Sequence, residues 1–431
     1  MIGQEKLTLM QSTSAEESFA DNVLRIALDI GEGLLKSGGE IHRVEFTIEK
    51  ICKSYGAEHV EVFSINSLIL ASIRMADGSY SSQNRRITDV SNHLLCLERY
   101  NRLSREICAT TPDFDTVDEE IRRIKKKRKH PFWVILVGHI LAAGAFAIFF
   151  GGSVRDGIAA GLIGVVIALI NSAKADYFNS MTRTLFTSFF GGALSCITVW
   201  AGIGENMDMV AIGTIMLLIP GLSLGNAARD LVGGDTLTGV LKSVQAVILA
   251  VMISIGYAIS IVTFGGLCPE AVQRQYPEII RWLAGAITAA IGTCGFAMIF
   301  KASAKRLAWV ALGGAVGYVV YEATVLLGGG VLLAAFMSAL FIALFSEISA
   351  RCFKAPAAVF LFTCAIPIVP GGSLYYTMYN LLKSNYAECL TKFQITVQII
   401  LGMALGISVA SVAFGMAMQL INKLSRKMTA R

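Results

Sequence analysis

The stretch Ile219-Pro220-Gly221-Leu222-Ser223-Leu224 returns 150 residues later as Val369-Pro370-Gly371-Gly372-Ser373-Leu374. The same shift, without a gap, aligns further pairs: Phe146 with Phe296, Ser153 with Ser303, Gly164 with Gly314, Lys242 with Lys392 and Gly256 with Gly406. Scattered matches between apolar sequences carry little weight, so the repeat rests mainly on the shared Pro-Gly core. Pro lacks a backbone N–H and Gly lets the backbone bend, so each copy is expected to interrupt a helix.

The composition around this repeat is that of a membrane protein. Of the 431 residues, 54% are hydrophobic and 16% charged, and the mean hydropathy is +0.61. A soluble domain carries about 25% charged residues. Most charge lies in residues 1–130, and long apolar runs follow the border at His130-Pro131. The nine cysteines form no C-x-x-C pair, so neither a metal site nor a disulfide framework is indicated.

Ten apolar runs approach the roughly 20 residues that cross a bilayer. They are 132–150, 154–172, 184–203, 208–224, 243–264, 280–300, 307–327, 329–346, 356–374 and 394–418. Five fall in each half, and an odd number turns the second half upside down relative to the first. The predicted fold is therefore a membrane all-α protein of about ten transmembrane helices, built as two inverted five-helix repeats, 131–279 and 280–431. Secondary transporters use this architecture.

Lys and Arg predict the orientation. Residues 1–18 are polar and contain no apolar signal-peptide core, so the N-terminus is expected in the cytosol. With ten spans, thirteen Lys and Arg after residue 130 fall on the inside and five fall outside, Arg281 among them. This bias follows the positive-inside rule. It predicts a multi-pass protein of the cell inner (cytoplasmic) membrane with both termini in the cytosol.

Residues 1–130 are expected to form a small cytosolic α+β domain. Apolar residues at helical spacing predict two helices broken at Ser37-Gly38-Gly39, followed by strands over 58–75 and 80–87. Two helices follow, over about 89–108 and 116–129, the second opening with a capping box formed by Thr116 and Glu119. Its basic end is expected to face the anionic leaflet. No aromatic residues interleave with these charges, so no nucleic-acid partner is expected.

The two Pro-Gly breaks are candidate parts of a transport path, because the N-terminus of a broken helix is partly positive and suits a carboxylate. The candidate path residues are Pro220, Gly221, Ser223, Asn226, Arg229, Asp230, Asp235, Pro370, Gly371, Ser373, Tyr376 and Asn380. The simpler interpretation is two ordinary helix kinks and, for the residues from Asn226 to Asp235, a solvated cytosolic loop.

Two acids within or at the end of predicted spans are candidates for proton coupling. An acid at the bilayer centre costs about 3 kcal/mol, so such residues usually face a partner or the protein interior. Glu322 is the better proton carrier because it lies within a span. Glu347 lies one helical turn from Arg351, so an interfacial ion pair is the alternative for it.

A dense polar cluster also occurs in the cytosolic domain: Glu32, Glu40, His42, Arg43 and Glu45. A hydrolytic site built from Glu32, His42 and Glu45 is one interpretation. A charged helix face is the other, and we prefer it, because no nucleophile motif, metal-ligand spacing or phosphate loop accompanies the cluster.

Several of these motifs resemble those of the threonine/serine exporter family. The segments 31–35, 37–45 and 101–105 are similar to its cytosolic landmarks, and Pro220-Gly221 with the following polar residues resembles its membrane motif. The segment 367–371 resembles the smaller companion module, which some bacteria make as a separate protein; that pair resembles a succinate exporter. The similarity covers about residues 20–420. It implies export of small metabolites from the cytosol, driven by the proton gradient.

The preferred function is therefore a proton-coupled antiporter that exports threonine and serine, with a small-molecule substrate, the lipid bilayer as its surroundings, no cofactor and no enzymatic activity. A homo-oligomer stays open. An exporter of C4-dicarboxylates such as succinate is the second hypothesis; it would need a further cation, and few Lys or Arg lie within the spans. A membrane-anchored hydrolase is the third hypothesis, and a passive channel is the fourth.

Overall fold

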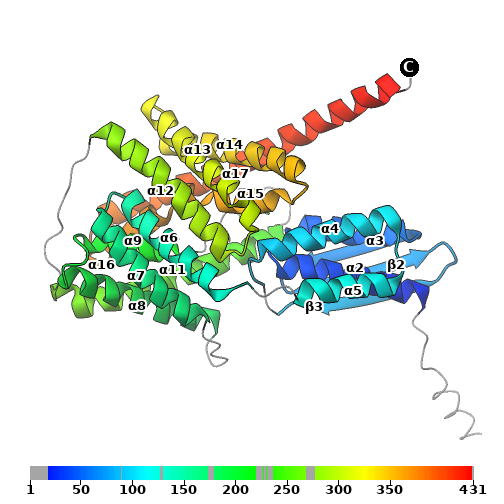
Figure 1. The fold of residues 1–431 in the computed structure, drawn as a ribbon, viewed down its shortest axis with the longest axis horizontal. Helices are drawn as coiled ribbons and strands as arrows, with labels where there is room; N and C mark the ends of the chain where they lie inside the picture. The colour runs from blue at the N-terminus through cyan, green and yellow to red at the C-terminus, as the bar shows by residue number, and fades with distance from the viewer. Residues whose placement is uncertain are drawn as a thin grey trace, which may run out of the picture. The chain divides into compact units, whose positions relative to one another are not determined.

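The computed structural model describes residues 18–88, 90–126, 130–172, 179–219, 227, 230, 236–267 and 277–429 (Figure 1). The chain divides into two compact units, Met1–Lys129 and His130–Arg431. We call them the cytosolic unit, after its predicted location, and the membrane unit, and describe each by itself.

The cytosolic unit is an α+β domain. Its elements are α2 (Phe19–Lys36), α3 (Ile41–Ser54), β1 (Ala57–Ile65), β2 (Leu68–Met75), β3 (Tyr80–Arg86), α4 (Leu94–Thr110) and α5 (Phe114–Lys126). The strands form one antiparallel sheet in the order β1-β2-β3. The prediction of two helices, three strands and two further helices is thereby confirmed.

The core of this unit forms where one face of the sheet meets α2 and α3. On β2, Ile69, Ala71 and Ile73 are buried, while the alternate residue Leu70 is exposed. This is the pattern of a strand with one covered face. The start of α2 is tied to the sheet by Asp21, whose carboxylate accepts a hydrogen bond from Ser81 Oγ at 2.6 Å. Hydrogen bonds from Ser81 and Ser18 lower the pKa of Asp21.

The predicted break between the first two helices is confirmed, and the predicted cap of α5 is wrong. Gly38 has a φ of +92°, which glycine adopts without strain. Helix α5 begins at Phe114, and Asp113 caps it by accepting hydrogen bonds from the N–H (3.2 Å) and hydroxyl (2.7 Å) of Thr116. The cap therefore lies three residues before Thr116. Asp is a better N-cap than Thr, which explains why Asp113 takes this position.

The membrane unit is helical throughout its described residues. Its elements are α6 (Phe132–Phe149), α7 (Val154–Ser172), α8 (Ser180–Trp200), α9 (Met207–Met216), α11 (Thr236–Phe264), η1 (Gly265–Leu267), α12 (Glu278–Ile299), η2 (Ala304–Arg306), α13 (Leu307–Leu326), α14 (Val331–Phe353), α15 (Ala357–Cys364), η3 (Ile366–Ile368), α16 (Gly371–Leu382) and α17 (Tyr386–Thr429).

Within the described residues, seven helices are long and apolar enough to cross a membrane. They are α6, α7, α11, α12, α13 with η2, α14 and α17. The bent pair α15–α16 makes an eighth if it counts as one span. The number falls short of the ten expected, because α8 opens with polar residues such as Thr182 and Arg183, and α9 has only ten residues. Ten residues rise about 15 Å, half of the bilayer core.

The helix boundaries follow the 150-residue spacing seen in the sequence. Helices α6 and α12 end at 149 and 299, and α9 and α15 begin at 207 and 357. Corresponding helices of the two halves also form corresponding pairs. Helix α6 packs with α7 as α12 packs with α13, and α8 packs with α11 as α14 packs with α17. The spacing therefore extends from the Pro-Gly stretch to the ends of the helices.

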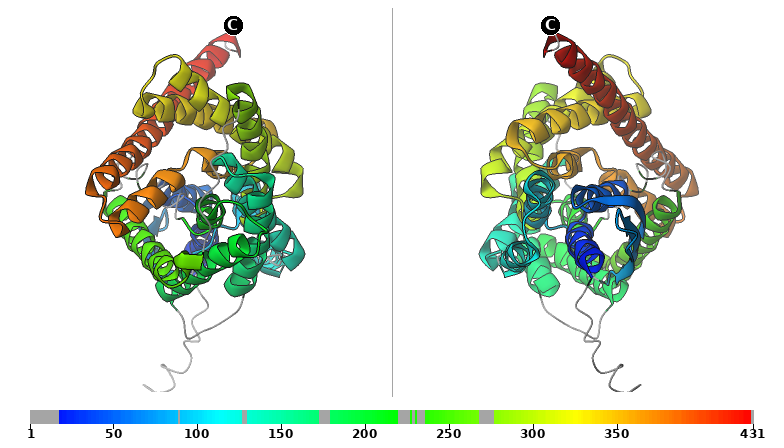
Figure 2. Two further views of the ribbon diagram at one scale, coloured as in Figure 1. Left: turned by 90° about the vertical axis from the view of Figure 1, so that its left-hand side faces the viewer. Right: turned by 90° about the vertical axis from the view of Figure 1, so that its right-hand side faces the viewer.

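Two matched glycines let the last pair in each half approach closely. A Cβ on Gly256 of α11 would lie 2.6 Å from the carbonyl oxygen of Leu185 on α8, and a Cβ on Gly406 of α17 would lie 2.5 Å from that of Phe336 on α14. Small residues allow this backbone approach between membrane helices. Helix α17 is long enough to pass α14 and extend beyond the other helices of the unit (Figure 2).

Candidate functional site

The second Pro-Gly stretch breaks a helix, as predicted. Helix α15 passes into η3, and α16 begins at Gly371; the two parts are bent by 45°. Pro370 is the N-cap of α16 and forms no side-chain capping bond. The first turn of a helix has N–H groups without partners inside the helix, and its macrodipole adds partial positive charge. This break therefore presents hydrogen-bond donors suited to an anion.

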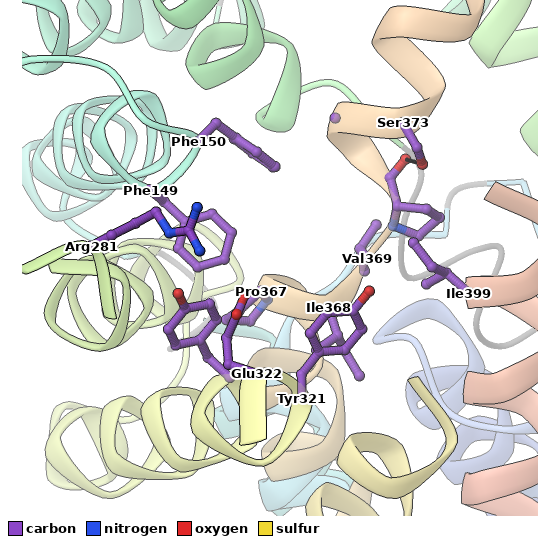
Figure 3. A pocket seen from close by; sticks show the side chains of 13 residues that line it. Phe149, Phe150, Arg281, Tyr321, Glu322, Pro367, Ile368, Val369, Ser373 and Ile399 are labelled. Carbon is purple, nitrogen blue, oxygen red and sulfur yellow. Dashed lines mark hydrogen bonds between the residues drawn. The ribbon is translucent and has the colours of Figure 1, made fainter. Parts of the chain in front are cut away.

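A cavity of about 390 Å³ opens at the break (Figure 3). It is lined by Phe149, Phe150, Arg281, Tyr318, Tyr321, Glu322, Pro367, Ile368, Val369, Pro370, Gly372, Ser373 and Ile399. These residues come from α6, α12, α13, α17 and the broken helix. The volume lies in the range of small-molecule sites. Residues far apart in the sequence thus meet beside the helix break.

The cavity contains one cationic and one anionic side chain. Arg281 belongs to the first turn of α12, and Glu322 lies near the end of α13. Both side chains point into the cavity in Figure 3. Arg281 is exposed at the end of its span, whereas Glu322 is only partly exposed, and an acid within a span is costly and usually marks a substrate or ion path. The site can therefore contact a positive and a negative group of one small molecule.

Aromatic rings form one wall. The Phe149 ring meets the Tyr318 ring edge to face, with centroids 5.1 Å apart. The path of α12 past α13 depends on Gly285, because a side chain there would collide with the Tyr318 ring. Tyr318 and Tyr321 both line the cavity, and each has a hydroxyl that can donate and accept hydrogen bonds.

Ser373 is fixed at the start of α16. Its hydroxyl donates to the carbonyl oxygen of Pro370 (3.2 Å) and accepts a hydrogen bond from Thr396 Oγ1 of α17 (2.9 Å). Gly372 lets Phe150 approach, since a Cβ there would lie 2.8 Å from that ring. These contacts hold the first turn of α16 against α6 and α17.

The structure brings together three of the predicted site residues and separates others. Pro370, Ser373 and Glu322 line the cavity. Gly371 is not among its lining residues, and Tyr376 and Asn380 lie farther along α16, where Asn380 Nδ2 donates to the Tyr376 carbonyl oxygen at 2.8 Å.

Glu347 lies elsewhere. Its carboxylate forms an ion pair with Arg351 at 2.9 Å, and the Arg351 guanidinium lies 4.0 Å from the centre of the Phe414 ring. This contact matches the alternative of an interfacial ion pair between neighbours on α14.

Of the candidates around the first Pro-Gly stretch, the structure describes one. Pro220, Gly221, Ser223, Asn226, Arg229 and Asp235 lie outside the described residues. Asp230 is buried, and its carboxylate accepts a hydrogen bond from Lys242 Nζ at 2.7 Å, with 15% of the Lys242 side chain exposed. Asp230 is therefore part of a buried ion pair.

Two further acids, the buried Asp156 and the partly exposed Asp208, were missed from the sequence. Asp156, at the start of α7, accepts hydrogen bonds from the N–H groups of Glu205 (2.7 Å) and Asn206 (2.8 Å). Asp208 accepts one from the hydroxyl of the buried Tyr375 at 2.9 Å. Asp156 is a lone acid between two apolar runs, and Asp208 follows Glu205 in the short polar segment between two others, which was the signal available. Both fix α9, the first against α7 and the second against α16.

In the cytosolic unit the polar cluster divides among separate partners. Glu32 pairs with Lys36 at 2.5 Å, and Glu40 lies 3.6 Å from Arg43. Glu45 accepts hydrogen bonds from the N–H and hydroxyl of Ser64 on β1. His42 is exposed. Among the described residues, no three His, Cys, Asp or Glu side chains form a group that could hold a metal. These contacts support a structural role for Glu45 rather than a hydrolytic one.

Arg281, Tyr318 and Tyr321 were not predicted as site residues. The sequence marks Arg281 only as an outer charge, because it stands at the end of an apolar run. The available signal was the spacing of Tyr318, Tyr321 and Glu322, which places three polar side chains near one face of α13.

Comparisons with known proteins agree with this architecture. The family model described as "Putative threonine/serine exporter" matches residues 25–264, and that described as "Threonine/Serine exporter, ThrE" matches residues 285–413. The threonine/serine exporter of Corynebacterium glutamicum is 20% identical over 91% of this chain and 82% of its own length. The "Probable succinate transporter subunit YjjP" is 23% identical in Klebsiella aerogenes, over 58% of this chain and 97% of its own, and 22% identical in Escherichia coli, over 56% and 95%.

No solved structure matches the chain. The family models together span the cytosolic unit and most of the membrane unit, and the first alone covers more than half of the residues. With its membrane-spanning helices, the chain is a multi-pass membrane protein, and it belongs to the threonine/serine exporter family.

Proposed function

We propose that this protein exports threonine and serine from the cytosol in exchange for protons. The observation that carries the proposal is the cavity at the break before α16, where Arg281, Glu322 and Ser373 meet. The name of the Corynebacterium relative supports the same substrates. The family is one of membrane transporters, so the work of the site is to bind and release a solute.

The charges of the cavity suit an amino-acid zwitterion. The substrate carboxylate binds Arg281 and the first-turn N–H groups of α16, because ionised groups form the stronger hydrogen bonds. The substrate ammonium binds Glu322. The short hydroxyl side chain of threonine or serine then faces Ser373, which already accepts and donates hydrogen bonds. A carboxylate at one end and an ammonium at the other need one cation and one anion.

Export is coupled to proton entry if one carboxylate binds the proton and the substrate in turn. Glu322 binds the ammonium when ionised and releases it when protonated, so proton and substrate exclude each other. A proton that enters from outside therefore expels the amino acid there. Glu347 is proposed only as an ion-pair partner of Arg351.

Alternating access is proposed to come from two inverted halves, 131–279 and 280–431. The 150-residue spacing of helix ends and the equivalent packing pairs support it. The proposal counts α8 and α9 as the two remaining spans of the first half, and the Lys and Arg bias then favours both termini in the cytosol of an inner membrane. The halves meet where α6 packs on α12. Whether one chain or an oligomer transports is open to measurement.

A decisive experiment is efflux of radiolabelled threonine, serine and succinate from cells loaded with each, with and without an uncoupler. Uncoupler-sensitive efflux of threonine and serine is expected. Efflux that ignores the uncoupler would instead indicate a passive channel and contradict the coupling proposed for Glu322.

Export of a C4-dicarboxylate is the second candidate. It is favoured by the names of two relatives and by the presence of both Arg281 and the α16 N-terminus in one cavity. The two carboxylates of such a substrate would, however, share the cavity with Glu322. The Glu322 carboxyl would then have to stay protonated to avoid repulsion. Succinate efflux without threonine or serine efflux would select this candidate.

A further inference from the structure

Two motifs of the cytosolic unit that the transport site does not use meet at one groove. The segment 37–45 leads into α3, and the segment 101–105 lies in α4, which packs against α3. A groove of about 590 Å³ lies between these helices. It is lined by Arg43, Phe46, Thr47, Lys50, Asn101, Ser104, Arg105, Cys108 and Ala109. The volume again fits a small molecule.

The groove is cationic. Arg43, Lys50 and Arg105 line it, and none of its described lining residues is acidic. Glu40 lies 3.6 Å from Arg43 Nε but is not a lining residue. Guanidinium groups bind phosphate oxygens in a bidentate manner, and three cations from two helices exceed what one carboxylate would need.

One side of the groove is aromatic. Phe46 is 52% exposed although it is large and apolar, and Lys50 Nζ lies 5.3 Å from the centre of its ring. An exposed ring beside cations can stack on a flat heterocycle. Close by, the Thr47 hydroxyl donates to the Arg43 carbonyl oxygen at 2.7 Å and the Ser104 hydroxyl to that of Asn101 at 3.0 Å. Both hydroxyls keep acceptor capacity toward a ligand.

We propose that this groove binds a nucleotide, with its phosphate on Arg43, Lys50 and Arg105 and its base against the Phe46 ring. The combination of cations, one exposed ring and polar side chains fits this class better than a small inorganic anion, which would leave Phe46 unused. The proposal concerns the cytosolic unit alone and does not depend on which solute the membrane unit exports.

The test uses the full-length protein in lipid nanodiscs and isothermal titration calorimetry with three probes: AMP, adenosine and inorganic phosphate. AMP contains both the phosphate and the base, whereas adenosine contains only the base and inorganic phosphate only the phosphate. Saturable binding of AMP is expected, at least tenfold tighter than that of adenosine or phosphate and weakened by added salt. Arg105→Ala is expected to weaken AMP binding at least tenfold.

Arg102→Ala is the matched control, because Arg102 is an exposed arginine of the same segment that does not line the groove. Its AMP affinity should stay within twofold of the parent protein. Phe46→Ala should weaken AMP and leave phosphate unchanged. Absence of saturable AMP binding, an equal loss in Arg102→Ala and Arg105→Ala, or phosphate binding as tight as AMP binding would each overturn the proposal. Failure of export with intact AMP binding would concern the membrane unit only.

Discussion

The two halves of the membrane unit share a helix plan but differ in charge. In the first half Asp230 and Lys242 form a buried ion pair. At the positions 150 residues later stand Asn380 and Lys392, and Lys392 Nζ lies 5.9 Å from the centre of the Tyr376 ring instead. Conversely, Glu322 and Arg281 of the second half align with Ser172 and Pro131.

Backbone architecture and side-chain chemistry are therefore separable in this fold. The matched helix ends and close-packed glycines keep the two halves alike, whereas single substitutions decide which half carries charge. In the described residues, the charged side chains that line the cavity both come from the second half. The first half contributes the rings of Phe149 and Phe150.

The largest effect on transport is expected for Arg281→Ala. Loss of a charge-assisted contact to the substrate carboxylate costs about 2 kcal/mol, or roughly 30-fold in apparent affinity. The measurement is threonine efflux as a function of internal threonine. Arg155→Ala is the control in the first half, because Arg155 is exposed and lies 3.7 Å from Glu205. Equal efflux in the two variants would remove Arg281 from the site.

Glu322→Gln is expected to lower efflux about tenfold and to abolish its response to an uncoupler, because an amide binds ammonium more weakly and carries no exchangeable acid proton. Glu347→Gln is the matched control and should keep both rate and uncoupler response. Should Glu347→Gln lose the response and Glu322→Gln retain it, the proposed roles of the two acids are reversed.

Asp230→Ala should destabilise the protein by about 3 kcal/mol, because it leaves Lys242 without its buried partner. The double variant Asp230→Ala/Lys242→Met should recover most of that loss, as measured by thermal unfolding in detergent. Lys392→Met tests the other half and should cost less than about 1 kcal/mol, the scale of a cation–π contact. Similar losses of stability for Asp230→Ala and Lys392→Met would contradict the proposed difference in charge pairing between the two halves.

Tyr375→Phe should cost about 1.5 kcal/mol, since it removes a hydrogen bond to a carboxylate. This bond joins α9 of the first half to α16 of the second. Tyr379→Phe removes a hydroxyl from the same helix, on a ring that stacks on Tyr375 at 5.8 Å, and serves as control. Unfolding midpoints that fall equally in both variants would show that the Asp208 contact is not what matters.

The sequence predicted the helix break at Pro370 and the importance of Glu322 because each violates a local rule. Proline cannot continue a helix, and an acid in an apolar run needs a reason. Arg281 obeys a local rule, since a cation at the end of a span is ordinary, and nothing in the sequence therefore singles it out. In the same way Thr116 matches a capping pattern, yet Asp113 caps α5.

Composition, periodicity and the stereochemistry of single residues are enough to predict the membrane unit, the α+β cytosolic unit, the spacing of 150 residues and the broken helix. The folded chain is needed to see that Arg281, Glu322 and Ser373 line one cavity and that Asp230 pairs with Lys242. These side-chain positions depend on how α12 packs against α6 and α13. Side-chain contacts between helices that are distant in the sequence leave no periodic signal in the chain.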